Sequence, residues 1–351
     1  MAVASDTQAA APAPEGPAER RARGGVAIGV LRRFLTLREG SIIVVTLVAF
    51  GYFAITTSNF VKGDSFRSLL PYFAPLAIIA AGEVFVMILG EIDLSVGAVY
   101  LFTPFMWHVF HHAGIPLYPS IILAVLVAMG LGAINGVFVA YVGIASFVAT
   151  LGMLFTLDGL SLVISHSTPI QVPGTGIGKV TSFGQIFGGG TYSELFWAIG
   201  IVIILQLVLT FTRWGLYTVS TGGNRLGAAE AGIRTRMIMV RNFILAAGLA
   251  GFAGILEVVR VTSATPDPSG SNTLLLQVVA AVIIGGTLMT GGDGTVVGAL
   301  IGALFLGILT EGLTIKGVSA NYLDLYLGIA IIIAMTLNVV VRRVRTGSGR
   351  A

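Results

Sequence analysis

The sequence predicts an all-α polytopic membrane protein of about ten transmembrane helices, and three observations support this class. Of the 351 residues, 55% are hydrophobic and only 10% are charged, whereas a soluble domain carries about 25% charged residues. Apolar runs of about 20 residues, the length that crosses a bilayer as a helix, recur along the chain. Glycine accounts for 47 residues, about twice its average share, and in membrane helices this indicates close packing.

The N-terminal segment, residues 1–38, is basic, and we expect it to be disordered in the cytoplasm. It is rich in Ala, Pro, Glu and Arg, a composition that cannot form a packed core. Its basic residues come late and no convincing cleavage site follows, so it is not a secretory signal peptide. Residues 26–37 are compatible with an interfacial helix before the first span.

Ten apolar segments follow within a transmembrane domain at 39–342. They are 41–58, 69–89, 93–112, 119–142, 144–165, 193–212, 240–260, 274–290, 294–315 and 322–341. Ten spans place both termini, including the tail at 343–351, on one side. That side holds six arginines before the first span, five in the centre and four at the C-terminus, which is 15 of the 20 Lys and Arg residues. Because positive residues accumulate in cytoplasmic segments, we expect both termini in the cytoplasm.

Two predicted outer loops differ from the cytoplasmic segments. The longer loop covers 166–192 and the shorter covers 260–273; both are polar and poor in charge. This composition suits contact with a soluble partner outside the membrane, and it equally suits plain connecting loops.

The central cytoplasmic loop, residues 213–240, predicts a short helix over 225–231. Strong helix formers fill these positions. Gly223 and Asn224 precede them as a flexible entry and an N-cap, and Gly232 follows where a glycine C-cap falls. The helix could dock a partner, or the loop could be a solvated, positive segment that only fixes topology.

Two apolar runs are interrupted, near 90–95 and 286–295, by glycines and an acid. Such breaks at membrane depth are tolerated only inside protein or beside water, and in transporters they indicate the pathway. Asp93 and Asp293 are also candidates to cap the helices that follow. The spacing after the two acids differs by one residue, so an internal repeat is only weakly indicated.

Other polar residues lie inside the predicted spans. A charge at the bilayer centre costs about 2.5–3.5 kcal/mol, so none of them should face lipid. Glu257 precedes Arg260 by three residues and should form a local ion pair. Glu83 has no such neighbour, so it is either protonated and bonded to another helix or lines an aqueous path. The candidate residues for a translocation path are Glu83, Asp93, Ser95, Asn135, Ser146 and Thr150.

Several kinds of chemistry are absent from the sequence. There are no cysteines, which excludes disulfides and thiolate catalysis. We find no phosphate-binding GxxxxGK[ST], no GxSxG or HExxH, and no metal spacing of histidines. We therefore expect no catalytic residue, cofactor or metal in this chain. The positive residues sort by topology, so we expect no nucleic-acid partner. A membrane path without its own energy source requires an external ATPase.

Four stretches resemble a known family. They are GEIDLSVGAV at 90–99, ASFVATLGML at 145–154, GGNRLGAAEAGI at 222–233 with AGLAGFAGIL at 247–256, and GGTLMTGGDGTVVGALIGAL at 285–304. In this order they resemble the permease subunits of bacterial ABC importers of the ribose/xylose type, in the superfamily shared with branched-chain amino-acid permeases. The resemblance covers about residues 40–342.

The resemblance implies a homodimer in the bacterial inner (plasma) membrane, cytoplasmic ATPase subunits that use ATP and Mg, and an external or periplasmic substrate-binding protein. It also implies that residues 222–233 are the coupling helix. Glu91 and the surroundings of Arg225 depart from the sugar-permease pattern. The residues implied in coupling are Gly223, Asn224, Arg225, Ala228, Ala229, Glu230 and Gly232.

The leading hypothesis is thus a permease subunit for a monosaccharide or related polyol. A branched-chain amino-acid or nucleoside ABC permease is the nearest alternative, because the external binding protein holds most of the selectivity in these systems. An ion-coupled secondary transporter would use Glu83, Asp93 and Asp158 as proton or cation sites. An intramembrane enzyme or a scaffold is the remaining alternative.

Overall fold

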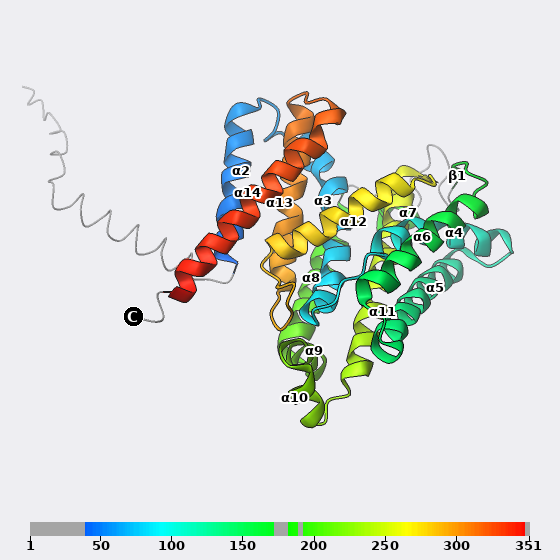
Figure 1. Ribbon diagram of the computed structural model, residues 1–351. Coiled ribbons are helices and arrows are strands. Elements are labelled where there is room, and N and C mark those ends of the chain that lie inside the picture. Colours follow the sequence, from blue (N-terminus) through cyan, green and yellow to red (C-terminus); the bar gives the residue numbers. More distant parts are fainter. Residues whose placement is uncertain (1–38, 172–181, 189–191, 348–351) are drawn as a thin grey trace, which may run out of the picture.

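The structure, a computed structural model, describes residues 39–171, 182–188 and 192–347 (Figure 1). Its helices are α2 (Gly40–Thr56), α3 (Gly63–Ile88), α4 (Val96–His112), α5 (Leu117–Val137), the π-helix η1 (Phe138–Val142), α6 (Ser146–Ile164), α7 (Ser182–Ile186), α8 (Ser193–Phe211), α9 (Arg213–Gly223), α10 (Arg225–Glu230), α11 (Thr235–Val261), α12 (Pro268–Ile284), α13 (Val296–Ile315) and α14 (Ala320–Gly347). Strands β1 (Ile170–Gln171) and β2 (Ser263–Ala264) are the only strands in these ranges.

The prediction of an all-α polytopic membrane protein is confirmed. The predicted N-terminal segment at 1–38, with its interfacial helix, lies outside the described residues.

Each predicted span overlaps a helix of the described ranges. Six are long and apolar enough to cross a membrane, namely α3, α5 with η1, α6, α8, α11 and α13. Three shorter apolar helices (α2, α12 and Ala320–Thr336 of α14) and the 17-residue α4 overlap the other predicted spans. The span predicted at 274–290 is displaced, because α12 begins at Pro268 and ends at Ile284. Proline favours the first helical turn, and Gly286, with φ of +95°, ends the helix.

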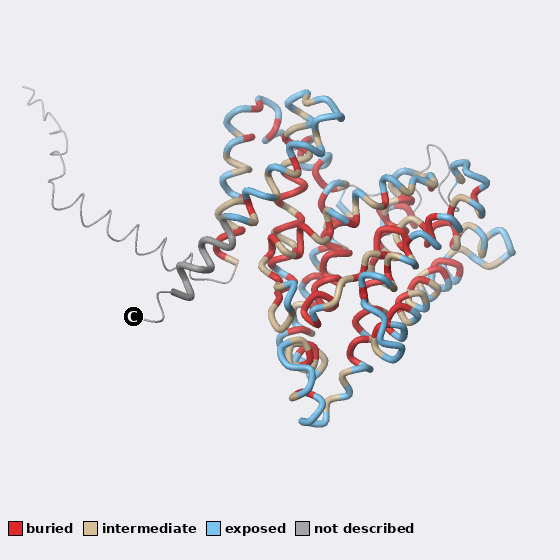
Figure 2. Tube along the Cα trace, viewed as in Figure 1, coloured by how far each residue is buried: buried red, intermediate tan, exposed pale blue. Residues whose placement is uncertain are grey.

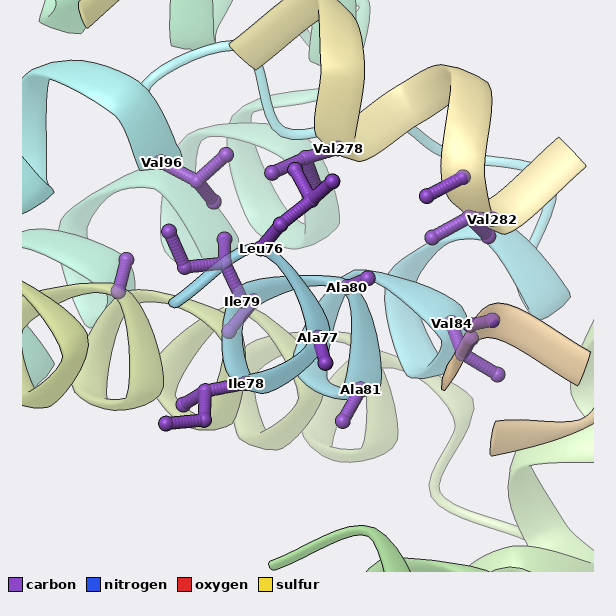
Figure 3. Packing of buried hydrophobic residues seen from close by; sticks show 14 of the residues in the cluster. Leu76, Ala77, Ile78, Ile79, Ala80, Ala81, Val84, Val96, Val278 and Val282 are labelled. Atoms are coloured by element: carbon purple, nitrogen blue, oxygen red, sulfur yellow. The ribbon is translucent and has the colours of Figure 1, made fainter. Parts of the chain in front are cut away.

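The core of the molecule is built around α3. Residues 76–81 are at most 1% exposed, and Figure 3 shows them packed against Val96, Val278 and Val282 from other helices. Figure 2 shows buried residues concentrated around α3, while α5 and α6 carry long exposed faces. Exposed side chains such as Val163 and Phe196 are apolar, as a lipid-facing surface requires.

Glycine allows two of the longest helices to touch. A Cβ atom on Gly132 of α5 would lie 2.4 Å from the carbonyl oxygen of Phe243 on α11. One turn further, a Cβ on Gly136 would lie 2.7 Å from the Cα of Val240. Two small residues four positions apart are the pattern that brings membrane helices into backbone contact. The prediction that excess glycine serves helix packing is confirmed here.

The two ends of the molecule are built differently. β1 pairs antiparallel with β2, with Ile170 opposite Ala264, so the two predicted outer loops are joined. In Figure 1, α9 and α10 lie at the opposite end from this ribbon, and the beginning of α2 and the end of α14 point toward that same end. The arrangement separates the predicted outer loops from the central segment.

Candidate coupling and translocation site

α10 is a six-residue helix with a defined cap at each end. The side chain of Asn224 accepts a hydrogen bond of 2.9 Å from the backbone N–H of Gly227, as an N-cap does. Gly232 has φ of +84°, and the N–H of Ile233 donates to the carbonyl of Ala228 at 3.0 Å, which completes a Schellman cap. The predicted capped helix is confirmed, with Ala231 as its C-cap rather than its last residue.

One face of α10 is open to a partner. Leu226 is 71% exposed, and Arg225, Ala229 and Glu230 are exposed beside it. Ala228, by contrast, is only 6% exposed and cannot contact a docked protein. Sequence reasoning missed Leu226, although it is the only large apolar residue of the helix. An exposed leucine on a projecting helix suits a groove on another protein.

The segment before α10 is helical, whereas the sequence predicted a loop there. The indole of Trp214 on α9 packs against Phe85 of α3 at 5.7 Å between ring centroids. Its Nε1 donates to Oδ1 of Asn242 on α11 at 2.8 Å, and Asn242 donates to the carbonyl of Phe85 at 2.7 Å. These contacts hold α9 against the core, so tertiary packing overrides the weak helix propensity of its threonines and glycines.

Three backbone segments meet where α9 passes into α10. The N–H of Gly292 donates to the carbonyl of Ile88 at 2.7 Å. A Cβ on Gly222 would lie 1.7 Å from that same carbonyl oxygen. A Cβ on Gly291 would lie 2.9 Å from it and 3.0 Å from the carbonyl oxygen of Gly222. We call this contact of Ile88, Gly222, Gly291 and Gly292 the glycine joint. It has no room for a side chain and connects the entry of α10 to both predicted breaks.

An ion pair runs beside the glycine joint. Nη2 of Arg225 lies 2.7 Å from Oε1 of Glu91, and the arginine side chain is 48% exposed. A pair this exposed contributes about 0–1 kcal/mol, so it orients the helix more than it stabilises the fold. The two positions that depart from the sugar-permease pattern are therefore partners in space.

The first break holds a buried polar network. Oε1 of Glu83 accepts the backbone N–H of Asp93 at 2.9 Å. Oδ1 of Asp93 accepts the N–H of Ser95 at 2.9 Å and its hydroxyl at 2.6 Å. Nδ2 of Asn135, from α5, donates to Oγ of Ser95 at 2.9 Å. All four residues are 0% exposed, which rules out lipid contact.

Two residues of α6 complete the surroundings of this break. Oγ1 of Thr150 accepts the N–H of Leu94 at 3.0 Å, and Oγ of Ser146 accepts the N–H of Ile92 at 3.3 Å. The structure thus brings all six predicted path residues together. Glu83, Asp93, Ser146 and Thr150 accept backbone N–H groups that an unwound segment leaves unpaired inside a membrane. Ser95 and Asn135 join this network through their side chains. The suggestion that Asp93 caps the start of α4 is confirmed, because its Oδ1 accepts the N–H of Ser95, whereas the Ser95 side chain makes no capping hydrogen bond.

Three buried oxygens of this network can accept further hydrogen bonds. Within the described ranges, Oε2 of Glu83, Oδ2 of Asp93 and Oδ1 of Asn135 are buried and have no hydrogen-bond partner. A buried oxygen without a donor costs about 1–3 kcal/mol. Three such oxygens in one cluster can therefore accept donors from a hydroxyl-bearing molecule or from a rearranged break.

The second break is capped from a distant helix. Oε1 of Gln206 on α8 accepts the N–H groups of Val296 and Val297 at 2.9 and 3.1 Å. Thr295 is the N-cap of α13, and its hydroxyl accepts the N–H of Gly298, while the suggestion that Asp293 also caps this helix stays a prediction. Sequence reasoning missed Gln206, although a polar amide side chain within an apolar span is a signal that could have indicated it.

The two breaks share one construction. Gly90 and Gly286 have φ of +77° and +95° directly after the C-caps of α3 and α12. Ser95 and Thr295 are the N-caps of the helices that follow, each two residues after an aspartate. The internal repeat is therefore clearer in the structure than the sequence spacing indicates. It is hidden in the sequence because the second break is four residues longer (285–295 against 89–95).

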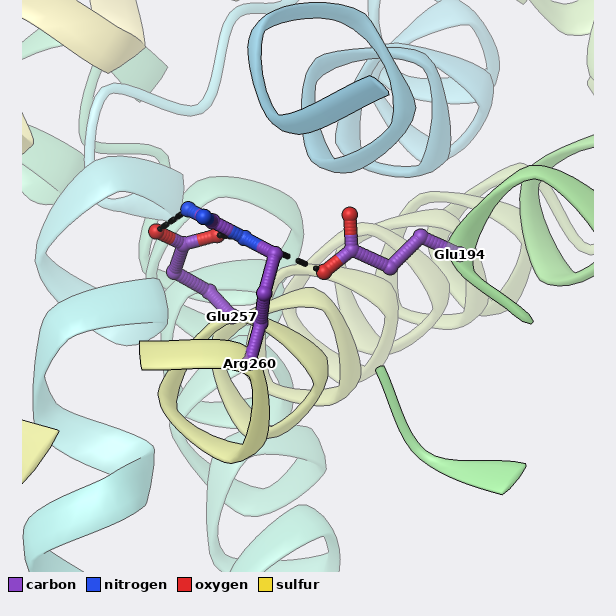
Figure 4. A network of polar contacts seen from close by, with 3 residues as sticks. All are labelled: Glu194, Glu257 and Arg260. Carbon is purple, nitrogen blue, oxygen red and sulfur yellow. Dashed lines mark hydrogen bonds and ion pairs between the residues drawn. The ribbon is translucent and has the colours of Figure 1, made fainter. Parts of the chain in front are cut away.

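The predicted ion pair near the outer end is confirmed and extended. Figure 4 shows Arg260 between two acids. Its guanidinium binds Glu257, with Nε 3.1 Å from Oε2, and Nε also lies 3.3 Å from Oε1 of Glu194 on α8. Sequence reasoning missed Glu194. Among the described residues no group of three or more His, Cys, Asp or Glu could hold a metal ion.

The chain is similar to one described protein family and to several known proteins. The family described as "Branched-chain amino acid transport system / permease component" matches residues 65–335. The chain is 31% identical to the xylose/arabinose import permease protein XylH of Sulfolobus acidocaldarius, over 90% of this chain and 88% of that protein. It is 32% identical to the ribose import permease protein RbsC of Escherichia coli, over 88% and 96%.

A further relative is the L-arabinose ABC transporter permease protein AraH of Azospirillum brasilense. The identity is 28%, over 95% of this chain and 96% of that protein. No solved structure matches this chain.

Proposed function

Because this chain belongs to the family of branched-chain amino acid transport system permease components, we propose that it is the membrane-spanning subunit of an ATP-driven importer for a monosaccharide or related polyol. Its relatives over most of its length are named as sugar import permeases. It is a multi-pass protein of the inner (plasma) membrane and acts as a transport subunit rather than as an enzyme.

The observation that carries this proposal is the exposed, capped α10 joined by backbone to both breaks. A cytoplasmic ATPase subunit, which uses ATP and Mg, docks on α10. Since the glycine joint has no space to absorb movement, displacement of α10 reaches the end of α3 and the second break directly. The buried network of Glu83, Asp93, Ser95 and Asn135 then lies beside the path that opens.

The remaining parts of the proposal concern assembly and topology. Two copies of the chain form the path between them, each with ten spans and with both termini in the cytoplasm. An external binding protein delivers the sugar to the end that carries the β1–β2 ribbon. This placement follows the 15-to-5 division of basic residues.

Transport by purified components tests the function. The chain is placed in proteoliposomes with the ATPase subunit, ATP and the binding protein, and uptake of labelled ribose, xylose and arabinose is measured. We expect uptake only when all components are present. Uptake of a sugar by this chain alone, driven by an ion gradient, would show an ion-coupled transporter instead, and uptake of leucine in place of sugars would assign the amino-acid alternative.

A further inference from the structure

A cleft of about 430 Å³ lies between α4 and the start of α12, with Leu101 and Leu274 among its lining residues. Ligand sites for small molecules have volumes of about 300–1,000 Å³, so the cleft suits a ligand of monosaccharide size. It begins directly after β2, at the predicted outer end. Its lining includes Tyr100, Thr265, Asp267, Ser271, Thr273 and Gln277.

The chemistry of the lining selects a neutral, hydroxyl-rich ligand. Hydroxyl and amide side chains both donate and accept hydrogen bonds, and the Asp267 carboxylate accepts them. No Lys or Arg of the described residues lines the cleft, whereas recognition of a carboxylate or phosphate normally uses a cation. The neighbouring cation, Arg260, is already paired with Glu257 and Glu194.

The cleft has a rigid polar wall. Ser271 is 3% exposed, and its hydroxyl donates to the carbonyl of Pro268 at 2.8 Å. The same hydroxyl lies 3.3 Å from Oδ1 of Asp158 on α6. A buried serine held by an acid from another helix fixes the start of α12 in place. Gln277, six residues further along α12, is a polar side chain that would be costly against lipid.

The two walls of the cleft are the helices that adjoin the two breaks. α4 follows the first break and α12 precedes the second. Behind the lining they are in contact, because a Cβ on Gly97 would lie 2.3 Å from the carbonyl oxygen of Ser271. Both breaks meet at the glycine joint. Because α4 follows the first break and α12 precedes the second, we expect a displacement of the joint to move α4 relative to α12.

We propose that this cleft is the outward-facing subsite at which the chain binds the sugar, with Asp267 and Gln277 as the polar groups that contact its hydroxyls. The proposal rests on the proposed function and adds the residues that touch substrate. Opening the contact between Gly97 and Ser271 is the step that releases the sugar from this subsite.

Site-directed labelling tests the subsite. The chain has no cysteine, so Thr273→Cys, at a lining position without an assigned sugar contact, introduces a single thiol. In proteoliposomes with the ATPase subunit and binding protein, we expect ribose, xylose or arabinose to slow labelling by an impermeant thiol reagent about tenfold. Asn272→Cys is the matched control, because Asn272 lies on the same helix outside the lining, and its labelling should not change. Protection of Thr273→Cys by leucine but not by sugars would overturn the ligand class.

Transport by Asp267→Asn and Gln277→Ala separates this proposal from the proposed function. Loss of hydrogen bonds to the sugar should reduce uptake at low sugar concentration by about tenfold or more, while ATP hydrolysis stimulated by the binding protein is retained. Sugar uptake equal to wild type in both variants would overturn the subsite and leave the importer intact. Absence of ATP-driven sugar uptake in the wild type would overturn the proposed function itself.

Discussion

At the residue scale, Glu83 has a structural role in the first break. Its Oε1 receives the N–H of Asp93, and the side chain is 0% exposed. A glutamine would keep that acceptor and add an amide donor to a network in which Asp93 and Asn135 each have an unpartnered oxygen. A leucine would leave the N–H of Asp93 unpaired, which costs about 1–3 kcal/mol.

We therefore expect Glu83→Gln to keep more than about half of the ATP-driven uptake, because the glutamine amide oxygen can accept the same hydrogen bond from the N–H of Asp93. Glu83→Leu should lower thermal stability and the yield of folded protein. Uptake assays and thermal unfolding of the two purified variants measure both effects. Complete loss of uptake in a well-folded Glu83→Gln, with ATP hydrolysis unchanged, would indicate that the carboxylate carries an ion.

At the scale of elements, α10 is expected to bind the ATPase subunit through Leu226. Replacing a fully docked apolar anchor by a charged residue typically costs about tenfold or more in affinity. Leu226→Asp should thus weaken binding of the ATPase subunit, measured by co-purification and by titration. Leu226→Met, which keeps the apolar volume, is the control, and Ala229→Arg should act in the same direction. Normal binding by Leu226→Asp would remove α10 from the interface.

The same element shows what sequence can predict. Residues 225–231 predict a helix because Asn224 and Gly232 act locally, through hydrogen bonds to residues a few positions away. α9 and the cap on α13 depend on Trp214 and Gln206, whose partners are 28 and 90 residues away. Contacts between residues so far apart in the chain cannot be recognised in a local sequence pattern. For the same reason, the sequence nominated all six path residues but did not show that they surround one break.

At the scale of the molecule, the proposed function requires α10 and the β1–β2 ribbon on opposite sides of the membrane. Because the chain lacks cysteine, single thiols can report this. Leu226→Cys should react with an impermeant reagent only from the cytoplasmic side, and Thr265→Cys only from outside. Labelling of intact cells and of inverted vesicles measures this. Reaction of both thiols from the same side would contradict the proposed topology.

In the whole molecule, α10 lies outside the helix bundle and the glycine joint connects its entry to the two broken spans. The polar network lies at the first break, and the cleft lies between the helices that adjoin the two breaks. Gly222 and Gly223 offer a matched pair for testing this connection. A Cβ on Gly222 would lie 1.7 Å from the carbonyl oxygen of Ile88, whereas the nearest atom to a Cβ on Gly223 is 3.9 Å away. Both changes to alanine favour a helix similarly, so only the joint distinguishes them.

The ratio of sugar imported to ATP hydrolysed in proteoliposomes measures whether the glycine joint couples α10 to the broken spans. Gly223→Ala should keep the wild-type ratio. Gly222→Ala should still bind the ATPase subunit and hydrolyse ATP, yet import at least about tenfold less sugar per ATP, because the overlap forces the joint apart. A wild-type ratio in Gly222→Ala would show that the glycine joint does not carry movement from α10 to the broken spans.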